Sequence, residues 1–241
     1  MCGRNRGEFG QPARRGGYAA HIRRDGVQLV FFDLDGTITR RDTLTPYVLG
    51  FALRRPWRLP GLLRVLPTLI RFLLGRADHG ALKGSLIQAA LGGATRAQLA
   101  QWNESFLPRL RSRGIFADAL QAIELHRRQH DRLILMSASV DLYVPQLARE
   151  LGFDACICSG VRWDGDRLLG TLSTANCRGE EKVRQLRAEA ALHPQLTTVA
   201  YGNSRPDLPH LLLAQRGFIV NPSASLWRDA AERGLTRLSW S

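Results

Sequence analysis

Short apolar runs alternate with longer segments of helical spacing along most of this chain. The runs are rich in β-branched and aromatic residues, which is typical of buried strands. They predict strands at residues 29–32, 133–136, 155–158, 197–200 and 217–220. Helical spacing predicts helices at residues 95–113, 116–130, 140–151, 180–191 and 208–215. Strands that alternate with helices imply a largely parallel sheet.

Three local signals refine this pattern. Pro108 predicts a kink or a boundary inside the first of these helices, and Ser139 is placed to cap the helix that begins at residue 140. The step Asp164-Gly165 lies between two short runs and predicts the turn of a hairpin around residues 163–167.

Residues 44–74 interrupt the alternation with a stretch dense in Leu, Val, Ile and Phe. A membrane-spanning helix needs about 20 mostly uncharged residues, and this stretch is interrupted by five arginines and by Pro56, Pro60 and Pro67. We therefore expect no conventional membrane span. Arg64 and Arg71 are seven residues apart and fall near one face of a helix over residues 61–75. Such a helix either lies at a membrane interface with its arginines toward lipid phosphates, or is buried in a helical module.

The composition fits a folded protein with an uneven distribution of charge. The chain has 241 residues, 44% of them hydrophobic, which suits one large domain or a core with an inserted module. Its net charge is +13, and most of the excess lies in residues 1–25 and 40–90. Residues 1–27 combine arginines with glycines and lack an apolar run, so we predict a basic disordered tail and not a signal peptide. A basic tail can bind anionic lipid or nucleic acid, but solvated disorder is the simpler explanation and we expect no specific nucleic-acid partner.

The cysteines exclude two other structural devices. The four cysteines stand at positions 2, 156, 158 and 177, which is too few and too irregular for a disulfide framework. The pair Cys156 and Cys158 lacks the second pair that a structural zinc site needs. Buried strand thiols in a reducing, cytoplasmic setting are therefore expected.

Polar groups follow three of the predicted strands. Asp33 and Asp35 follow the first strand, Ser137 follows the second, and residues 202–207 follow the strand at 197–200. Open α/β sheets bind ligands at the carboxyl ends of their strands. Lys182 begins an intervening helix and is one of only two lysines among 34 cationic residues. Paired carboxylates with a lysine suit Mg²⁺-dependent phosphoryl transfer, although an Asp-rich strand end is also typical of a turn or a helix cap.

The order and spacing of these groups resemble a known family. Four motifs of the haloacid dehalogenase-like (HAD) hydrolases are matched by Asp33-Leu34-Asp35-Gly36-Thr37, Ser137, Lys182, and Gly202-Asn203-Ser204 with Asp207. The resemblance covers residues 28–222, and Thr37 marks the phosphatase form. It implies an α/β fold with a Rossmann-like core and mostly parallel sheet at residues 28–39 and 126–241. An all-helical cap at residues 40–125 would be inserted after the first strand, as in the phosphoserine-phosphatase-like IB subfamily.

The same resemblance implies roles for individual residues. Asp33 would attack phosphorus and form an aspartyl-phosphate, and Asp35 would transfer the proton. The phosphoryl group would be bound by Thr37, Ser137, Ala138 and the catalytic Lys182. Mg²⁺ would be bound by Asp33, Asp35, Asn203 and Asp207. Asn203 stands where the family usually has an acid, which removes one negative charge from the site but keeps an amide oxygen that can bind Mg²⁺.

The expected substrate is a phosphorylated small molecule or lipid. The arginine-studded apolar cap resembles that of phosphatidylglycerophosphate phosphatase C, which implies a lipid phosphate and peripheral contact with the inner face of an anionic membrane. Pro206 lacks the hydrogen-bonding side chain found near this place in phosphoserine phosphatases, which argues against that substrate. A soluble small-molecule phosphatase, a phosphotransferase and a non-catalytic HAD-like protein that binds membrane or nucleic acid stay open as alternatives.

Overall fold

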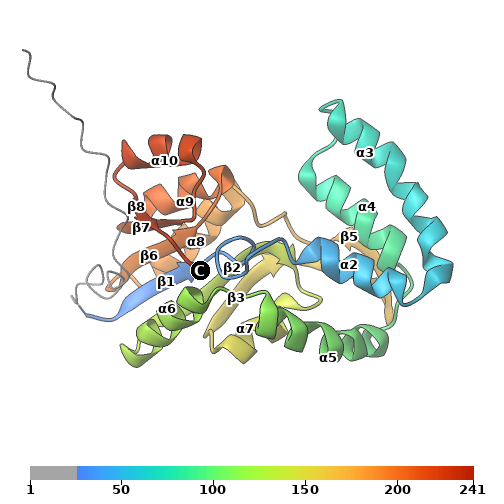
Figure 1. Ribbon diagram of the computed structural model, residues 1–241, viewed down its shortest axis with the longest axis horizontal. Coiled ribbons are helices and arrows are strands. Elements are labelled where there is room, and N and C mark those ends of the chain that lie inside the picture. The colour runs from blue at the N-terminus through green and yellow to red at the C-terminus, as the bar shows by residue number, and fades with distance from the viewer. Residues whose placement is uncertain (1–25) are drawn as a thin grey trace, which may run out of the picture.

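Six parallel strands form the central sheet of the structure, a computed structural model that describes residues 26–241 (Figure 1). They are β1 (Gln28–Phe32), β2 (Arg132–Val140), β3 (Ala155–Ser159), β6 (Thr197–Gly202), β7 (Arg216–Val220) and β8 (Thr236–Leu238). Their order across the sheet is β3-β2-β1-β6-β7-β8. Strand β1 lies between β2 and β6, so the groups that follow these three strands meet at one edge of the sheet.

Helices cover both faces of this sheet. Side chains alternate along β1, so that Val30 and Phe32 pack into one apolar cluster and Leu29 and Phe31 into the other. The first cluster is covered by α6 (Ala117–Arg128) and α7 (Val144–Leu151), and the second by α8 (Glu180–Leu192), α9 (Leu208–Leu213) and α10 (Ala224–Ala231). Because both faces are buried, β1 is a continuous apolar run after its first residue, Gln28.

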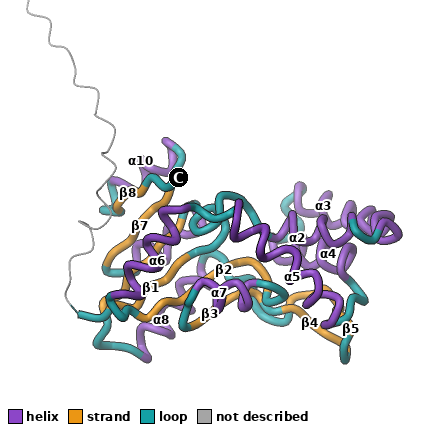
Figure 2. The backbone as a smooth tube through the Cα atoms, turned by 60° about the horizontal axis from the view of Figure 1, so that its bottom comes forward, coloured by secondary structure: helices purple, strands orange, loops and turns teal. Residues whose placement is uncertain are grey.

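A second group of helices lies between β1 and α6 in the sequence and at one end of the sheet in space (Figure 1). We call this group the helical layer. It consists of α2 (Leu44–Leu53), the 3-10 helix η1 (Pro56–Val65), α3 (Leu66–Leu73), α4 (His79–Leu91) and α5 (Arg96–Arg113). Figure 2 shows the hairpin of β4 (Val161–Asp164) and β5 (Arg167–Leu172) at the same end of the molecule. Strand β5 packs on α4 at Gly170, where a Cβ would lie 2.5 Å from Gln88 Cα.

The structure confirms the α/β fold with a parallel sheet and corrects several details. Strand β2 continues to Val140 and α7 begins only at Val144, so Ser139 does not cap a helix. Pro108 lies inside α5 without ending it. The predicted helix at residues 61–75 is divided between η1 and α3, so Arg64 and Arg71 do not share one continuous α-helical face. The sequence pattern does not predict helix α10 or strand β8.

The structure also bears on the predicted hairpin, the cysteines, the basic tail and the absence of a membrane span. The hairpin turn is confirmed, with Gly165 at a φ of 54°. Cys156 and Cys158 are half-buried in β3, and Cys177 is buried, all three as free thiols. The predicted tail lies outside the described residues except for Gly26 and Val27. Within residues 26–241, no helix combines the length and the hydrophobicity that crossing a bilayer requires.

Candidate active site

Asp33 begins a tight loop at the carboxyl end of β1. Its backbone N–H donates to the Tyr201 carbonyl at 3.0 Å, and the amides of Ile38 and Thr39 both donate to the Leu34 carbonyl at 2.9 Å. Gly36 makes this loop possible in two ways. Its φ is +84°, and a Cβ there would lie only 2.0 Å from Asn203 Nδ2.

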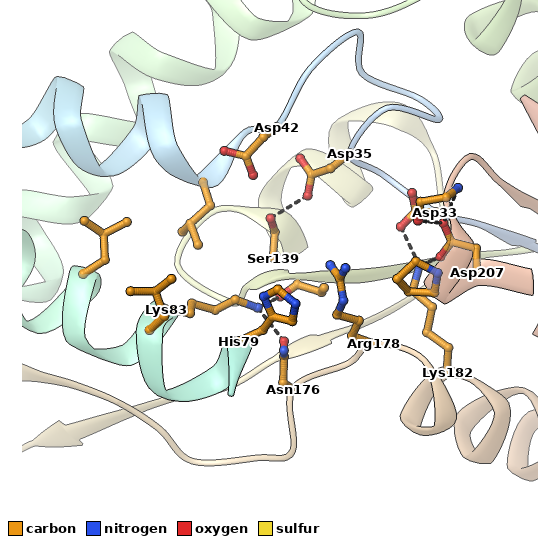
Figure 3. Close-up of a pocket in the computed structure, with 16 residues that line it drawn as sticks. Asp33, Asp35, Asp42, His79, Lys83, Ser139, Asn176, Arg178, Lys182 and Asp207 are labelled. Carbon is orange, nitrogen blue, oxygen red and sulfur yellow. Dashed lines mark hydrogen bonds and ion pairs between the residues drawn. The ribbon is translucent and has the colours of Figure 1, made fainter. Parts of the chain in front are cut away.

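Lys182 bridges the carboxylate that follows β1 and a carboxylate in the loop after β6 (Figure 3). Its Nζ donates to Asp33 Oδ1 at 2.6 Å and to Asp207 Oδ1 at 2.8 Å. The Lys182 side chain is only 2% exposed, and the two carboxylates are almost as buried. Since isolated buried charges are strongly unfavourable, each of these groups depends on the others.

The cluster carries more negative than positive charge. Burial raises the pKa of Asp33 to about 7 against the attraction of Lys182, and repulsion from Asp207 and Asp35 adds to the rise. Burial also opposes ionisation of Asp207, but the charges of Lys182 and His210 and the hydrogen bonds from Lys182 and Ser204 together outweigh it and lower the pKa of Asp207. For Lys182 itself, burial favours the neutral amine, whereas Asp33 and Asp207 together raise its pKa. The surplus negative charge therefore resides on Asp33 when it ionises.

Asp35 is fixed by bonds to the beginning of the helical layer. Its Oδ1 accepts from the N–H of Thr43 at 2.7 Å and from the Thr43 hydroxyl at 2.6 Å. Its Oδ2 accepts from Ser139 Oγ at 2.7 Å, which is the role that Ser139 plays in place of capping a helix. Burial raises the pKa of Asp35. A carboxyl group with a raised pKa is suited to carrying a proton.

Asp207 organises the loop after β6. While its Oδ1 accepts from Lys182, its Oδ2 accepts from Ser204 N at 3.0 Å, from Ser204 Oγ at 2.5 Å and from Asn203 N at 3.3 Å. Both carboxylate oxygens are thus engaged. The arrangement fixes Lys182 and the backbone of Asn203, and the metal role of Asp207 stays a prediction.

The remaining predicted residues lie around this cluster in different ways. Thr37 is fully buried and donates from Oγ1 to Asp33 Oδ2 at 2.9 Å. Ser137 is also fully buried, and its Oγ accepts from Ser139 N at 3.0 Å. Asn203 is half-buried beside Gly36. A cavity of about 260 Å³ is lined by Asp33, Asp35, Ala138, Lys182 and Asp207 together with residues of the helical layer, and Thr37, Ser137 and Asn203 are not part of its lining.

Sequence reasoning did not identify which residues of the helical layer line this cavity. Lys83 of α4 donates from Nζ to the Ala138 carbonyl and, at 2.5 Å, to Asn176 Oδ1. Burial lowers the pKa of Lys83 to about 8. His79 and Arg178 line the cavity beside it (Figure 3). The scarcity of lysine, which indicated Lys182, also distinguishes Lys83, because these are the two lysines of the chain.

The donor set fits Mg²⁺, an ion that prefers oxygen ligands. The Asp33 carboxylate, the Asp35 backbone carbonyl and the Asn203 amide oxygen come from adjoining loops, and the surplus negative charge at Asp33 is what a divalent cation would neutralise. Across residues 26–241, no group of three or more His, Cys, Asp or Glu residues could by itself hold a metal ion. A magnesium site here would therefore need the carbonyl and amide oxygens as well as the carboxylate.

The comparisons with known proteins define the class. The family model of the haloacid dehalogenase-like hydrolases matches residues 30–212, so the chain belongs to this hydrolase family. The predicted family and the prediction of a hydrolytic enzyme are thereby confirmed.

Particular relatives agree with this assignment. The chain is 35% identical over 198 residues to the protein CicA of Caulobacter vibrioides, covering 80% of this chain and 86% of the relative. It is 28% identical over 240 residues to a probable phosphatase of Mycobacterium tuberculosis, covering 95% of this chain and 80% of that one. A solved structure from Bordetella pertussis, of a protein of unknown function, has the same fold with a TM-score of 0.75 at 22% identity, over 88% of this chain and 98% of that chain.

Proposed function

We propose that this protein is a Mg²⁺-dependent phosphomonoester hydrolase that works through an aspartyl-phosphate intermediate. The observation that carries the proposal is the buried pair of Asp33 and Lys182, 2.6 Å apart at the carboxyl end of β1. The family, and a relative described as a probable phosphatase, support the same reaction class.

In the proposed first step, an Asp33 carboxylate oxygen attacks phosphorus as the bond to the leaving alcohol breaks. Asp35 gives its proton to the leaving oxygen, which departs as the alcohol. In the second step, Asp35 removes a proton from water, the water oxygen attacks phosphorus, and the Asp33 carboxylate is released with inorganic phosphate. The raised pKa of Asp35 supports this alternation between acid and base.

The other residues of the site hold the reacting groups. Lys182 places its ammonium where negative charge grows on the phosphoryl oxygens, and Thr37 fixes the second oxygen of Asp33. We assign phosphoryl binding to Ser137 and the backbone at Ala138. Mg²⁺, held by Asp33, the carbonyl of Asp35 and Asn203, would supply Lewis-acid stabilisation of the transferred group. Asp207 would act on the metal site through the loop that carries Asn203.

For the substrate, we propose a lipid phosphate such as phosphatidylglycerophosphate, met at the inner face of the membrane. The cavity supports this choice because apolar side chains of the helical layer, Leu44, Leu82 and Leu86, line it beside His79 and the cationic Lys83. An enzyme with such a cavity can accept a substrate whose phosphate group is attached to an anionic or apolar moiety.

The test is a screen for Mg²⁺-dependent phosphate release from lipid and soluble phosphomonoesters, phosphoserine included. We expect release with wild-type protein and none with Asp33→Asn, which keeps the shape of the side chain but removes its charge. Activity that survives this substitution would rule out the covalent mechanism. Analysis of the products separates a hydrolase, which yields free phosphate, from a phosphotransferase, which yields a new phosphoester.

A further inference from the structure

One surface of the helical layer exposes apolar side chains that the fold leaves uncovered. Neither η1 nor α3 contributes a single buried residue. Trp57 is 72% exposed and Leu73 is 74% exposed. We call this surface the η1–α3 face, and its exposed apolar members are Trp57, Leu63, Leu66, Ile70, Leu73 and Leu74. Soluble monomers seldom expose large contiguous apolar patches unless the patch binds something.

The exposed apolar side chains of α3 lie together on one face of the helix. Leu66, Ile70, Leu73 and Leu74 follow the spacing of one helical face. The opposite face carries the half-buried Phe72, whose ring lies 4.8 Å from that of His79 on α4. Helix α3 is therefore held against α4 by one side and presents leucine and isoleucine outward from the other.

The charge around the face has one sign. Arg64, Arg71 and Arg76 are exposed, and none of them forms a salt bridge with any residue of the described chain. No acidic residue lies between Asp42 and Asp78. Other arginines of this segment are already used within the layer, as when Arg58 donates to the Gly92 carbonyl at 2.9 Å. The face is thus apolar, flanked by unpaired cations and free of anions.

We propose that the η1–α3 face docks on the surface of an anionic lipid bilayer. Leucine, isoleucine and tryptophan side chains would enter the interface, and the three free arginines would contact lipid phosphates. Nucleic acid matches the charge but not the six apolar side chains, and an ordinary protein partner matches the apolar side chains but not the charge.

The place of the face gives this docking a consequence for the reaction. His79, which contacts Phe72 of α3, also lines the cavity that holds Asp33 and Lys182. Figure 1 shows α3 on the outer side of α4, away from the sheet. A docked enzyme would bring its cavity near the headgroups, so that a lipid phosphate could enter while its acyl chains stay in the bilayer. This consequence rests on the proposed function, whereas the docking does not.

The experiment is co-sedimentation of the full chain with vesicles of phosphatidylcholine alone or with added phosphatidylglycerol, neither of which carries a phosphomonoester. We expect binding to the anionic vesicles only. The double variant Ile70→Ser/Leu73→Ser should lower vesicle affinity at least tenfold, and Arg64→Gln/Arg71→Gln should do the same with most of the loss at low salt. The matched control is Arg187→Gln/Leu192→Ser, which alters an exposed cation and an exposed leucine of α8 and should bind as wild type does.

Further measurements separate the alternatives. The basic residues 1–25 are present in every variant, so equal binding by all of them would assign binding to that segment and overturn the proposal. A wild-type dimer that Ile70→Ser/Leu73→Ser dissociates, without vesicle binding, would make a second copy the occupant and overturn it too. Brominated lipids should quench Trp57 fluorescence, with the quenching reduced in Trp57→Phe. Asp33→Asn should still bind vesicles, so a failure of the phosphatase proposal is distinguishable from a failure of docking.

Discussion

Lys182 donates from Nζ to Asp33 Oδ1 at 2.6 Å, and both side chains are almost entirely shielded from solvent. The same ammonium lies 2.8 Å from Asp207 Oδ1. One cation therefore serves two buried carboxylates that come from different loops. Because the bonds join β1, α8 and the loop after β6, this cluster contributes to the fold as well as to the proposed chemistry.

Replacing Lys182 by Met should damage both properties. The change leaves two buried carboxylates without their cation, so we expect the free energy of unfolding to fall by about 3–5 kcal/mol. We expect kcat to fall by roughly 10²–10³ because a group that stabilises growing phosphoryl charge is lost. Urea unfolding and steady-state kinetics measure the two effects. Arg184→Met, which breaks an exposed ion pair on the same helix, is the control and should cost at most about 1 kcal/mol.

The raised pKa of Asp33 predicts a particular pH dependence of stability. Burial moves this pKa from 3.8 to about 7 in the folded protein. The folded state therefore holds a proton that the unfolded state has released, and Asp33 stabilises the fold most below about pH 4 and loses that contribution as the pH rises toward about 7. In EDTA, wild-type stability should fall more steeply over this range than that of Asp33→Asn. Unfolding curves at several pH values check this, and a steeper fall in the variant would contradict it.

The sequence predicts the sheet well because β-branched and aromatic runs such as residues 29–32 have few alternatives to a buried strand. Strand β8 has only three residues and depends on pairing with Val220 and its neighbours, which no local pattern shows. Ser139 was misassigned because Ser after an apolar run is a typical helix cap. In the structure the run continues as strand, which directs the hydroxyl to Asp35.

Part of the site was predictable from the sequence because the predicted strands determine where the residues that follow them lie. Asp33 and Asp35 come just after β1 and Asp207 lies in the loop after the neighbouring β6, so the sheet itself brings them together. Lys83 is separated from Ala138 by 55 positions and reaches it only because α4 folds back over the sheet edge. Helical spacing indicates which residues share a face but not which distant loop that face will meet.

Replacing Asn203 by Asp, the acid usual in the family at this place, should raise the affinity of the proposed site for Mg²⁺. Asn203 offers a neutral amide oxygen, whereas Asn203→Asp would add a further full negative charge near Asp33. We expect the Mg²⁺ concentration for half-maximal activity to fall by roughly tenfold, since about 1.4 kcal/mol of added attraction gives that factor. Titration of activity with Mg²⁺ is the measurement. An unchanged requirement would show that residue 203 is not a metal ligand.

Gly36→Ala should disable the site while leaving the core of the sheet intact. The new Cβ would approach Asn203 Nδ2 to 2.0 Å at a φ of +84°, where a side chain is also strained. Either the first loop or the loop after β6 must move, so we expect a fall in kcat of about tenfold or more together with a loss of about 1–3 kcal/mol in unfolding free energy. Gly26→Ala is a suitable control because its φ is also positive and no atom lies within 4 Å of the added Cβ. If both variants lost activity equally, the close contact with Asn203 would not be the cause.

Lys83→Met should separate substrate binding from chemistry. Lys83 donates to the Ala138 carbonyl and to Asn176 and lines the cavity, and within residues 26–241 it forms no hydrogen bond with Asp33 or Lys182. Loss of a charged hydrogen-bonding group costs about 1.5–3 kcal/mol, so we expect KM to rise by roughly tenfold or more with a much smaller change in kcat. Asn176→Ala, which removes one partner of the ammonium but keeps its charge, should raise KM less. A fall in kcat with KM unchanged would instead place Lys83 in the transfer step, because only an interaction made in the transition state changes kcat alone.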